Sequence, residues 1–75
     1  MSTTTEGDCY ESLSRTMVLL REIKGISMRE HARQLGMSPA TLSRVEAGKG
    51  CDLKTLCAIH NATGVKLHTL LGEKP

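Results

Sequence analysis

The 75-residue chain has no Trp or Phe and only one Tyr. Aliphatic side chains must therefore build its core. Strands draw stability from aromatic and β-branched pairs, whereas short packed helices do not need them. A chain of this length buries only about 60% of its unfolded surface, so its core must be compact. The composition predicts one small all-α domain.

Long apolar runs are also missing. No stretch reaches the roughly 18 apolar residues of a membrane span, and the N-terminus has no basic region followed by an apolar one. The three cysteines, Cys9, Cys51 and Cys57, form no Cys-x-x-Cys pair. An odd number of cysteines in an unsecreted chain argues against a disulfide framework. We expect a cytoplasmic chain with reduced thiols and no membrane partner.

Metal-site and catalytic patterns are weak or missing. Cys57 and His60 stand one helical turn apart, with Cys51 and His68 in the same half, but this spacing is poor for structural zinc. We expect no metal, and instead a small buried thiol near a core histidine. The chain has no nucleophile with an associated base, no paired carboxylates and no Gly-rich phosphate loop. We expect no enzymatic activity, no cofactor and no small-molecule ligand.

The formal net charge is only +2, but the charges are unevenly distributed. Glu6, Asp8 and Glu11 precede Ser12, whereas all ten Lys and Arg residues follow it. The domain after Ser12 is therefore mildly basic. This charge is compatible with binding phosphates, but it does not distinguish nucleic acid from other acidic partners.

A short helix is predicted between Ser27 and Gly36. Ser27 is a good N-cap, and Glu30 three residues later completes a capping box. Ala32 and Leu35 form its inward stripe. Gly36 supplies the left-handed conformation that commonly ends a helix.

After a tight turn, a second short helix is predicted over residues 39–47. Ser38 caps it, and Pro39 occupies the first helical position, where a missing N–H costs nothing. Leu42 and Val45 lie on one face, and a glycine follows the last turn. The opposite face is small and polar, as required of a helix that enters a groove about 12 Å wide.

The remaining segments complete an expected bundle of five helices. Leu13, Met17 and Leu20 predict a first helix from about Glu11 to Lys24. Asp52 caps a later helix whose buried stripe is Leu53, Leu56 and Ile59 and which ends at Gly64, and a short last helix follows within Val65 to Leu71. The expected organisation is a flexible arm over 1–10 without a DNA contact, a domain over 11–72 and a polar tail over 73–75.

Some residues have two open interpretations. Leu19 and Ile23 form a second apolar strip on the first helix, which is either an extra core contact or a surface for a partner. His31 and His60 are expected to be hydrogen-bonded core histidines. The alternative for them is a core that senses pH or metal.

The spacing of Ala32, Gly36, Met37, Ser38 and Leu42, followed by Ser43-Arg44-Val45-Glu46-x-Gly48, resembles the Cro/repressor (Xre-like) helix-turn-helix family. The resemblance spans roughly Leu13 to Leu71. It implies a lambda-repressor-like bundle and a bacterial or phage-encoded transcriptional regulator, such as a repressor of its own promoter. The alternative is an antitoxin-like module that uses the same fold to bind a protein.

The resemblance also implies which residues face the DNA bases: Pro39, Ala40, Thr41 and Arg44. Many relatives have Gln at the first of these positions. Pro39 and Ala40 cannot form a bidentate amide pairing with adenine, so we expect them to contact thymine methyl groups. Arg44 is expected to bond O6 and N7 of guanine, and the alternatives are a phosphate contact or a solvated charge.

Phosphate contacts are expected at helix N-termini and in the loop after the second short helix. The corresponding residues are Ser27, Met28, Arg29, Ser38, Thr41, Ser43, Lys49 and Lys54. Relatives usually have Gln at the position of Met28. We expect that contact to be lost or replaced by one from Arg29.

Two further features follow from the resemblance. Arg21 and Glu46 match a salt bridge between helices that orients the recognition helix. The dimer surface of similar proteins maps to Val65, Leu67, His68 and Leu71. We expect a homodimer that binds double-stranded DNA at an inverted-repeat operator and inserts residues 39–47 into the major groove.

Overall fold

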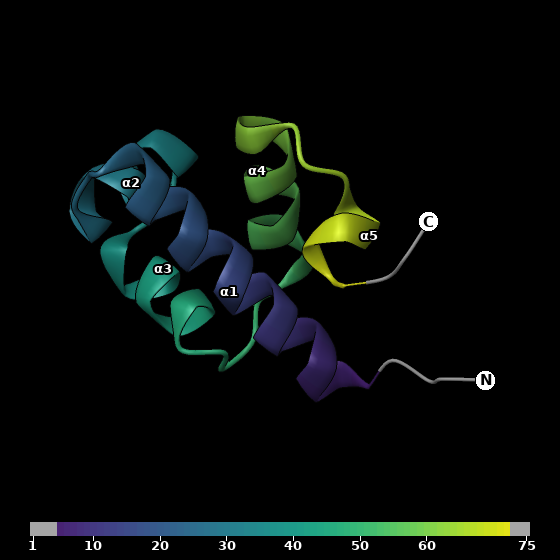
Figure 1. Cartoon of the computed structure of the whole chain (residues 1–75). Coiled ribbons are helices and arrows are strands. Elements are labelled where there is room, and N and C mark those ends of the chain that lie inside the picture. The colour runs from purple at the N-terminus through teal and green to yellow at the C-terminus, as the bar shows by residue number, and fades with distance from the viewer. Residues whose placement is uncertain (1–4, 73–75) are drawn as a thin grey trace.

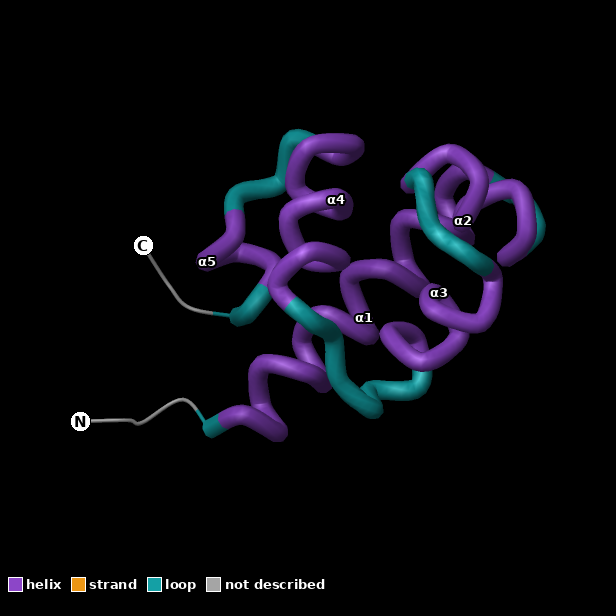
Figure 2. The backbone as a smooth tube through the Cα atoms, turned by 180° about the vertical axis from the view of Figure 1, so that it is seen from behind, coloured by secondary structure: helices purple, strands orange, loops and turns teal. Residues whose placement is uncertain are grey.

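The computed structural model describes residues 5–72, which form five helices joined by short loops (Figure 1). In chain order these are α1 (Glu6–Lys24), α2 (Met28–Leu35), α3 (Pro39–Glu46), α4 (Leu53–Thr63) and α5 (Leu67–Leu70). Figure 2 shows helices and loops throughout this range, so the predicted all-α class is confirmed. Within these residues, no helix is both long and apolar enough to cross a bilayer.

Helix α1 begins at Glu6 and not at the predicted Glu11. Thr5 is its N-cap: the Thr5 hydroxyl accepts from the backbone N–H of Asp8 at 3.1 Å, and the Asp8 carboxylate accepts from the N–H of Thr5 at 3.2 Å. This capping box gives acceptors to two backbone donors that a helix start leaves unpaired. The expected arm over 1–10 is therefore wrong from Glu6 onward, while residues 1–4 and the expected tail, 73–75, lie outside the described residues.

Helix α2 has the predicted ends but not the complete predicted capping box. The Ser27 hydroxyl accepts from the N–H of Glu30 at 3.1 Å, and Gly36 ends the helix with φ 74°. The Glu30 carboxylate does not reach back to Ser27. It accepts instead from Arg33 and Gln34, which lie on the same helix face.

The core draws on all five helices. Helix α1 runs between the α2–α3 pair and the α4–α5 pair, and it contacts α3 and α5 (Figure 1). The buried apolar side chains are Leu13, Met17, Ala32, Leu35, Leu42, Val45, Ile59 and Leu70. These aliphatic residues supply the core that the composition predicted.

Three leucine and isoleucine side chains lie outside this core. Leu53 is 71% exposed, so its predicted place in the buried stripe of α4 is wrong. It is the first residue of α4, and side chains in a helix lean toward the N-terminus, which carries Leu53 past the packed surface. Leu19 and Ile23 are 56% and 72% exposed, which excludes the interpretation that they are extra core contacts.

His31 lies on the inward face of α2. It is fully buried, and neither ring nitrogen has a hydrogen-bond partner among the described residues. The predicted hydrogen bond is therefore wrong for His31, whose two ring nitrogens are enclosed in the core with no described polar atom within hydrogen-bonding distance. For His60 the predicted hydrogen bond is confirmed, since its Nδ1 lies 2.7 Å from the carbonyl oxygen of Val65, but its side chain is half-buried and not a core residue. Burial, reinforced by the positive charge of Lys24, lowers the pKa of His31.

The predicted pair of Arg21 and Glu46 forms and ties α1 to the last residue of α3. Arg21 donates from Nε and Nη2 to the two carboxylate oxygens of Glu46, at 2.9 and 3.0 Å. The Glu46 side chain is 7% exposed. Ser14, two turns earlier on α1, donates its hydroxyl to the backbone carbonyl of Glu46. Helix α1 therefore holds the end of α3 by both its side chain and its backbone.

We expect His31→Leu to raise the free energy of unfolding at pH 7 by roughly 1–3 kcal/mol, because it removes two buried polar atoms that lack partners. The wild type should also be acid-sensitive. The folded-state pKa of His31 is lowered, so its protonation favours the unfolded state. The free energy of unfolding should therefore be highest above the unfolded pKa of about 6.5, and it should fall as the pH drops through the folded value. Urea unfolding measured between about pH 5 and 8 tests both statements.

Comparison of the wild type with His31→Leu isolates the contribution of His31, because the two proteins share every other titratable group. An equal loss of stability with falling pH in the wild type and in His31→Leu would show that His31 is not the acid-sensitive group.

We expect Arg21→Met to lower the thermal denaturation midpoint, because it leaves the nearly buried Glu46 carboxylate without its cation. The double variant Arg21→Met/Glu46→Leu should recover most of that loss, since apolar residues can replace a buried ion pair at little cost. Midpoints from circular dichroism test this ordering. A double variant less stable than Arg21→Met would contradict it.

Candidate nucleic-acid interface

Helix α3 presents a small, polar face to solvent. Leu42 and Val45 are buried on its inner face, while the exposed residues on the opposite side are Pro39, Ala40, Ser43 and Arg44. None of the first three carries a bulky side chain. Arg44 is therefore the long hydrogen-bond donor on the exposed face of this helix.

Thr41 and Ser38 differ from this exposed set because they bond to each other. The Ser38 hydroxyl caps α3 by accepting from the N–H of Thr41 at 3.2 Å, and the two hydroxyl oxygens lie 2.9 Å apart. Thr41 is half-buried. The two hydroxyls thus stand together at the N-terminus of α3.

Two adjoining hollows lie between α3 and the segment that leads into α4. The first, here the Lys49 hollow, is lined by Tyr10, Thr41, Arg44, Val45, Lys49, Gly50, Cys51, Asp52 and Thr55. The second, here the Lys54 hollow, is lined by Gly36, Met37, Ser38, Thr41, Asp52, Lys54, Thr55 and Ala58. Thr41, Asp52 and Thr55 belong to both, so the hollows form one concave strip beside α3.

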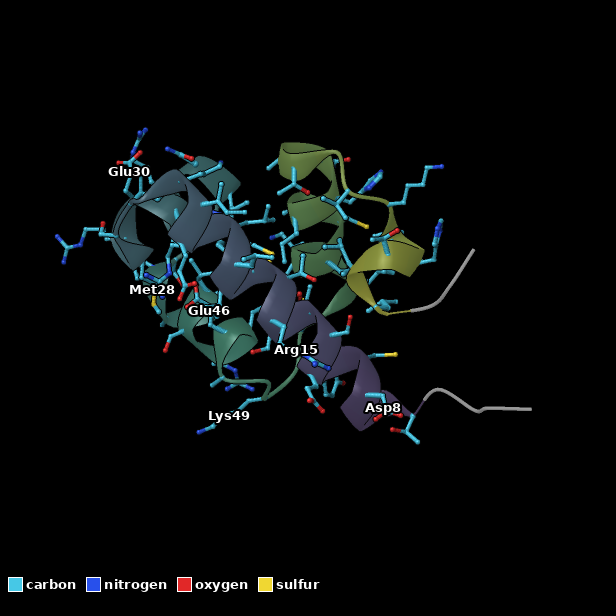
Figure 3. All side chains as sticks on the ribbon, viewed as in Figure 1. Asp8, Arg15, Met28, Glu30, Glu46 and Lys49 are labelled. Carbon is cyan, nitrogen blue, oxygen red and sulfur yellow. The ribbon has the colours of Figure 1, made fainter. Side chains whose placement is uncertain are left out.

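This strip brings together five of the residues expected to contact DNA, namely Ser38, Thr41, Arg44, Lys49 and Lys54. Arg44 and Lys49 share one hollow, and Ser38 and Lys54 share the other. Lys49 lies in the loop after α3 and extends away from the body of the molecule (Figure 3). The strip therefore combines cations with two helix N-termini, an arrangement that suits an anionic backbone.

The start of α2 does not line either hollow. Ser27 and Arg29 are exposed, while Met28 is half-buried and packs against the core (Figure 3). Met28 is therefore used for packing, as expected for an apolar residue at that position. The exposed cation at this end of α2 is Arg29.

Asp52 places one negative charge in the strip. Its carboxylate accepts from the N–H of Thr55 at 2.8 Å and caps α4 as predicted. The side chain and the backbone N–H of Thr55 hold the pKa of Asp52 below its usual range. The carboxylate therefore stays ionised and offsets part of the positive charge of the neighbouring lysines.

The cysteines are free thiols, as predicted. Cys57 is exposed, so its predicted place as a buried thiol near a core histidine is wrong: it lies on the solvent side of α4. Cys51 is half-buried, and burial together with the charge of Asp52 raises the pKa of its thiol. No group of three metal-binding side chains occurs among the residues described.

The residues expected at a dimer surface cluster around α5, at the end of the molecule away from α2 (Figure 1). Leu67 is 36% exposed, and Val65, His68 and Leu71 are half-buried. Their neighbour Leu70 is fully buried in the core. Part of this apolar surface therefore remains open to solvent.

Sequence reasoning missed Tyr10 and Ser14 as neighbours of this strip. Tyr10 falls within the flexible arm predicted over 1–10, so no contact was predicted for it. Ser14 lies in the first turn of the predicted helix. The signal that could have revealed it is the Thr5-x-x-Asp8 capping pattern, which places the helix start ahead of Tyr10.

A family model described as helix-turn-helix matches residues 19–70, from the last two turns of α1 to the last residue of α5. Searches of curated proteins and of solved structures gave no match. The matched segment is more than half of the chain and contains α2, the turn and α3 described above. The chain therefore belongs to the Cro/C1-type, Xre-like helix-turn-helix family of DNA-binding regulators.

Proposed function

We propose that this protein is a transcriptional regulator of bacterial or phage type that represses by occupying an operator, including the operator of its own gene. The observation that carries the proposal is the exposed face of α3, which is small, polar and firmly held from behind by α1. A helix with such a face can approach base edges in the major groove without steric hindrance.

Arg44 reads sequence in this proposal. It is the exposed long donor on α3, and a guanidinium matches the O6 and N7 acceptors of guanine. Pro39 and Ala40 contact thymine methyl groups, because they offer apolar surface and no side-chain donor. Thr41 stands beside them, with its hydroxyl close to Ser38.

Phosphates are held around this reading face. Lys49 and Lys54 supply charge from the two hollows, while Ser38 and Ser43 supply hydroxyl groups on α3 itself. At the start of α2, Ser27 and Arg29 take this role, and Met28 does not. Such contacts give affinity and register without sequence preference.

The protein binds as a symmetric dimer, because one short recognition helix reads too few base pairs to select a single genomic site. The contact surface is Val65, Leu67, His68 and Leu71. This surface is small, so dimerisation is weak in solution and is completed on DNA. The operator is then an inverted repeat.

A second candidate function is an antitoxin-like module that binds a protein. The exposed strip of Leu19 and Ile23 favours it, since both side chains leave apolar surface in solvent on the outer face of α1. A toxin-like gene in the same operon, with a product that binds the wild type but not Leu19→Ser/Ile23→Ser, would support this function.

Arg44→Ala should relax the preference at one base pair per half-site and cost about 1–3 kcal/mol there, because it removes a base contact. Lys49→Ala should weaken binding to all sequences and flatten the salt dependence, because it removes a phosphate contact. Binding of both variants to a randomised operator library, at several salt concentrations, separates the two effects. Uniform weakening by both would contradict the base-reading role of Arg44.

The half-sites of the inverted repeat should be centred about 10–10.5 base pairs apart, so that two α3 helices enter successive major grooves on one side of the duplex. Inserting about five base pairs between them places the half-sites on opposite sides and should abolish tight binding.

Analytical ultracentrifugation of the protein with each duplex measures the stoichiometry. Inserting a full helical turn, about 10 base pairs, is the control for added length, because it returns both half-sites to the same side of the duplex. A stable complex with one protein copy that ignores the shorter insertion would eliminate the dimer proposal.

A further inference from the structure

One face of α1 runs along the end of α3 and the loop that follows it. Tyr10, Ser14 and Arg21 share this face, at spacings of four and seven residues. Arg21 and Ser14 bond to the side chain and the backbone carbonyl of Glu46. The contacts then continue beyond α3, into the loop that carries Lys49.

Lys49 stands between two glycines with left-handed backbones. Gly48 has φ 72° and Gly50 has φ 116°. Glycine has no Cβ and loses the most conformational freedom when it is ordered. A lysine flanked by two glycines therefore points in a fixed direction only if other parts of the structure restrain the loop.

Helix α1 contacts both glycines. A Cβ atom placed on Gly48 would lie 4.0 Å from Cβ of Ser14. One placed on Gly50 would lie 3.5 Å from Cζ and 3.7 Å from the hydroxyl of Tyr10. The two side chains are one helical turn apart and cover the glycines on either side of Lys49.

The restraint on the two sides of Lys49 is different. Toward α3, the backbone N–H groups of Gly48 and Lys49 donate to the carbonyls of Val45 and Arg44, each at 3.1 Å. Beyond Lys49, the ring of Tyr10 lies over Gly50 and forms a wall of the Lys49 hollow. Tyr10 thus contacts the loop on the side that the α3 backbone bonds do not reach.

We propose that Tyr10 is a positioning residue for DNA binding: its ring packs on Gly50 and holds the loop so that Lys49 faces the phosphate backbone. The proposal rests on the proposed DNA-binding function and extends it to a segment of α1 that precedes the family match at residues 19–70. Tyr10 acts through Lys49, by the area of its ring.

The experiment compares Tyr10→Ala and Tyr10→Phe on a duplex that the wild type selects from a randomised library. Tyr10→Ala should lower the affinity roughly fivefold near 0.1 M salt and reduce the salt slope by about one phosphate contact, with the base preference unchanged. Tyr10→Phe should keep most of the wild-type affinity and slope, because it keeps the ring beside Gly50.

A double-mutant cycle with Lys49→Ala distinguishes positioning from a general loss of stability. In the Lys49→Ala background, Tyr10→Ala should cause no further loss of affinity, because both changes remove the same contact. Val18→Ala is the matched control on α1: it truncates a half-buried apolar side chain that lines neither hollow, and it should leave affinity and slope unchanged.

Gly50→Ala keeps the experiment decisive if Tyr10→Ala fails to fold. Alanine is strained at φ 116°, so this variant disturbs the same loop with α1 intact, and it should lower the affinity without adding to Lys49→Ala. Additive losses in these cycles, or equal losses in Tyr10→Ala and Tyr10→Phe, would overturn the positioning role. A wild type that selects no duplex would overturn the proposed function as well.

Discussion

The packing of α3 against α1 is the constraint on which the rest of the structure depends. An eight-residue helix is too short to be stable in water by itself, because the cost of forming its first turn is not recovered over so few residues. Leu42 and Val45 bury its inner face, and Arg21 and Ser14 hold its last residue, Glu46. The outer face can then remain small and polar without contributing to stability.

This division of roles explains where charge lies on the molecule. The buried side of α3 has apolar contacts, with one ion pair and the hydrogen bond from Ser14 at its end, whereas Arg44, Lys49 and Lys54 border the solvent side. Asp52 is the exception, since its carboxylate is needed to cap α4 and therefore stays ionised beside the lysines. The carboxylate that stabilises the start of α4 thus weakens the attraction of this strip for anions.

The fold could be predicted from the sequence to a large extent, because the signals for helix ends act over three or four residues. Ser27, Ser38 and Asp52 each accept from the backbone N–H three residues later, as their residue types indicated. The start of α1 was missed because its cap is Thr5 with Asp8, in a polar segment without an apolar stripe. The apolar spacing also predicted that Leu53 is buried in the core. It is exposed, because it is the first residue of α4 and its side chain extends past the packed surface.

The sequence by itself determined the helices, the turn and the face of α3 that points outward, since these follow from caps, glycines and apolar spacing within single segments. The resemblance to the family also indicated the pair of Arg21 and Glu46, which are 25 residues apart. Only the tertiary structure decided that His31 is buried without a partner, that Cys57 is exposed, and that Tyr10 covers Gly50. The physical reason is that these properties depend on which side chains of distant segments come into contact, and the spacing of residues within one segment does not predict those contacts.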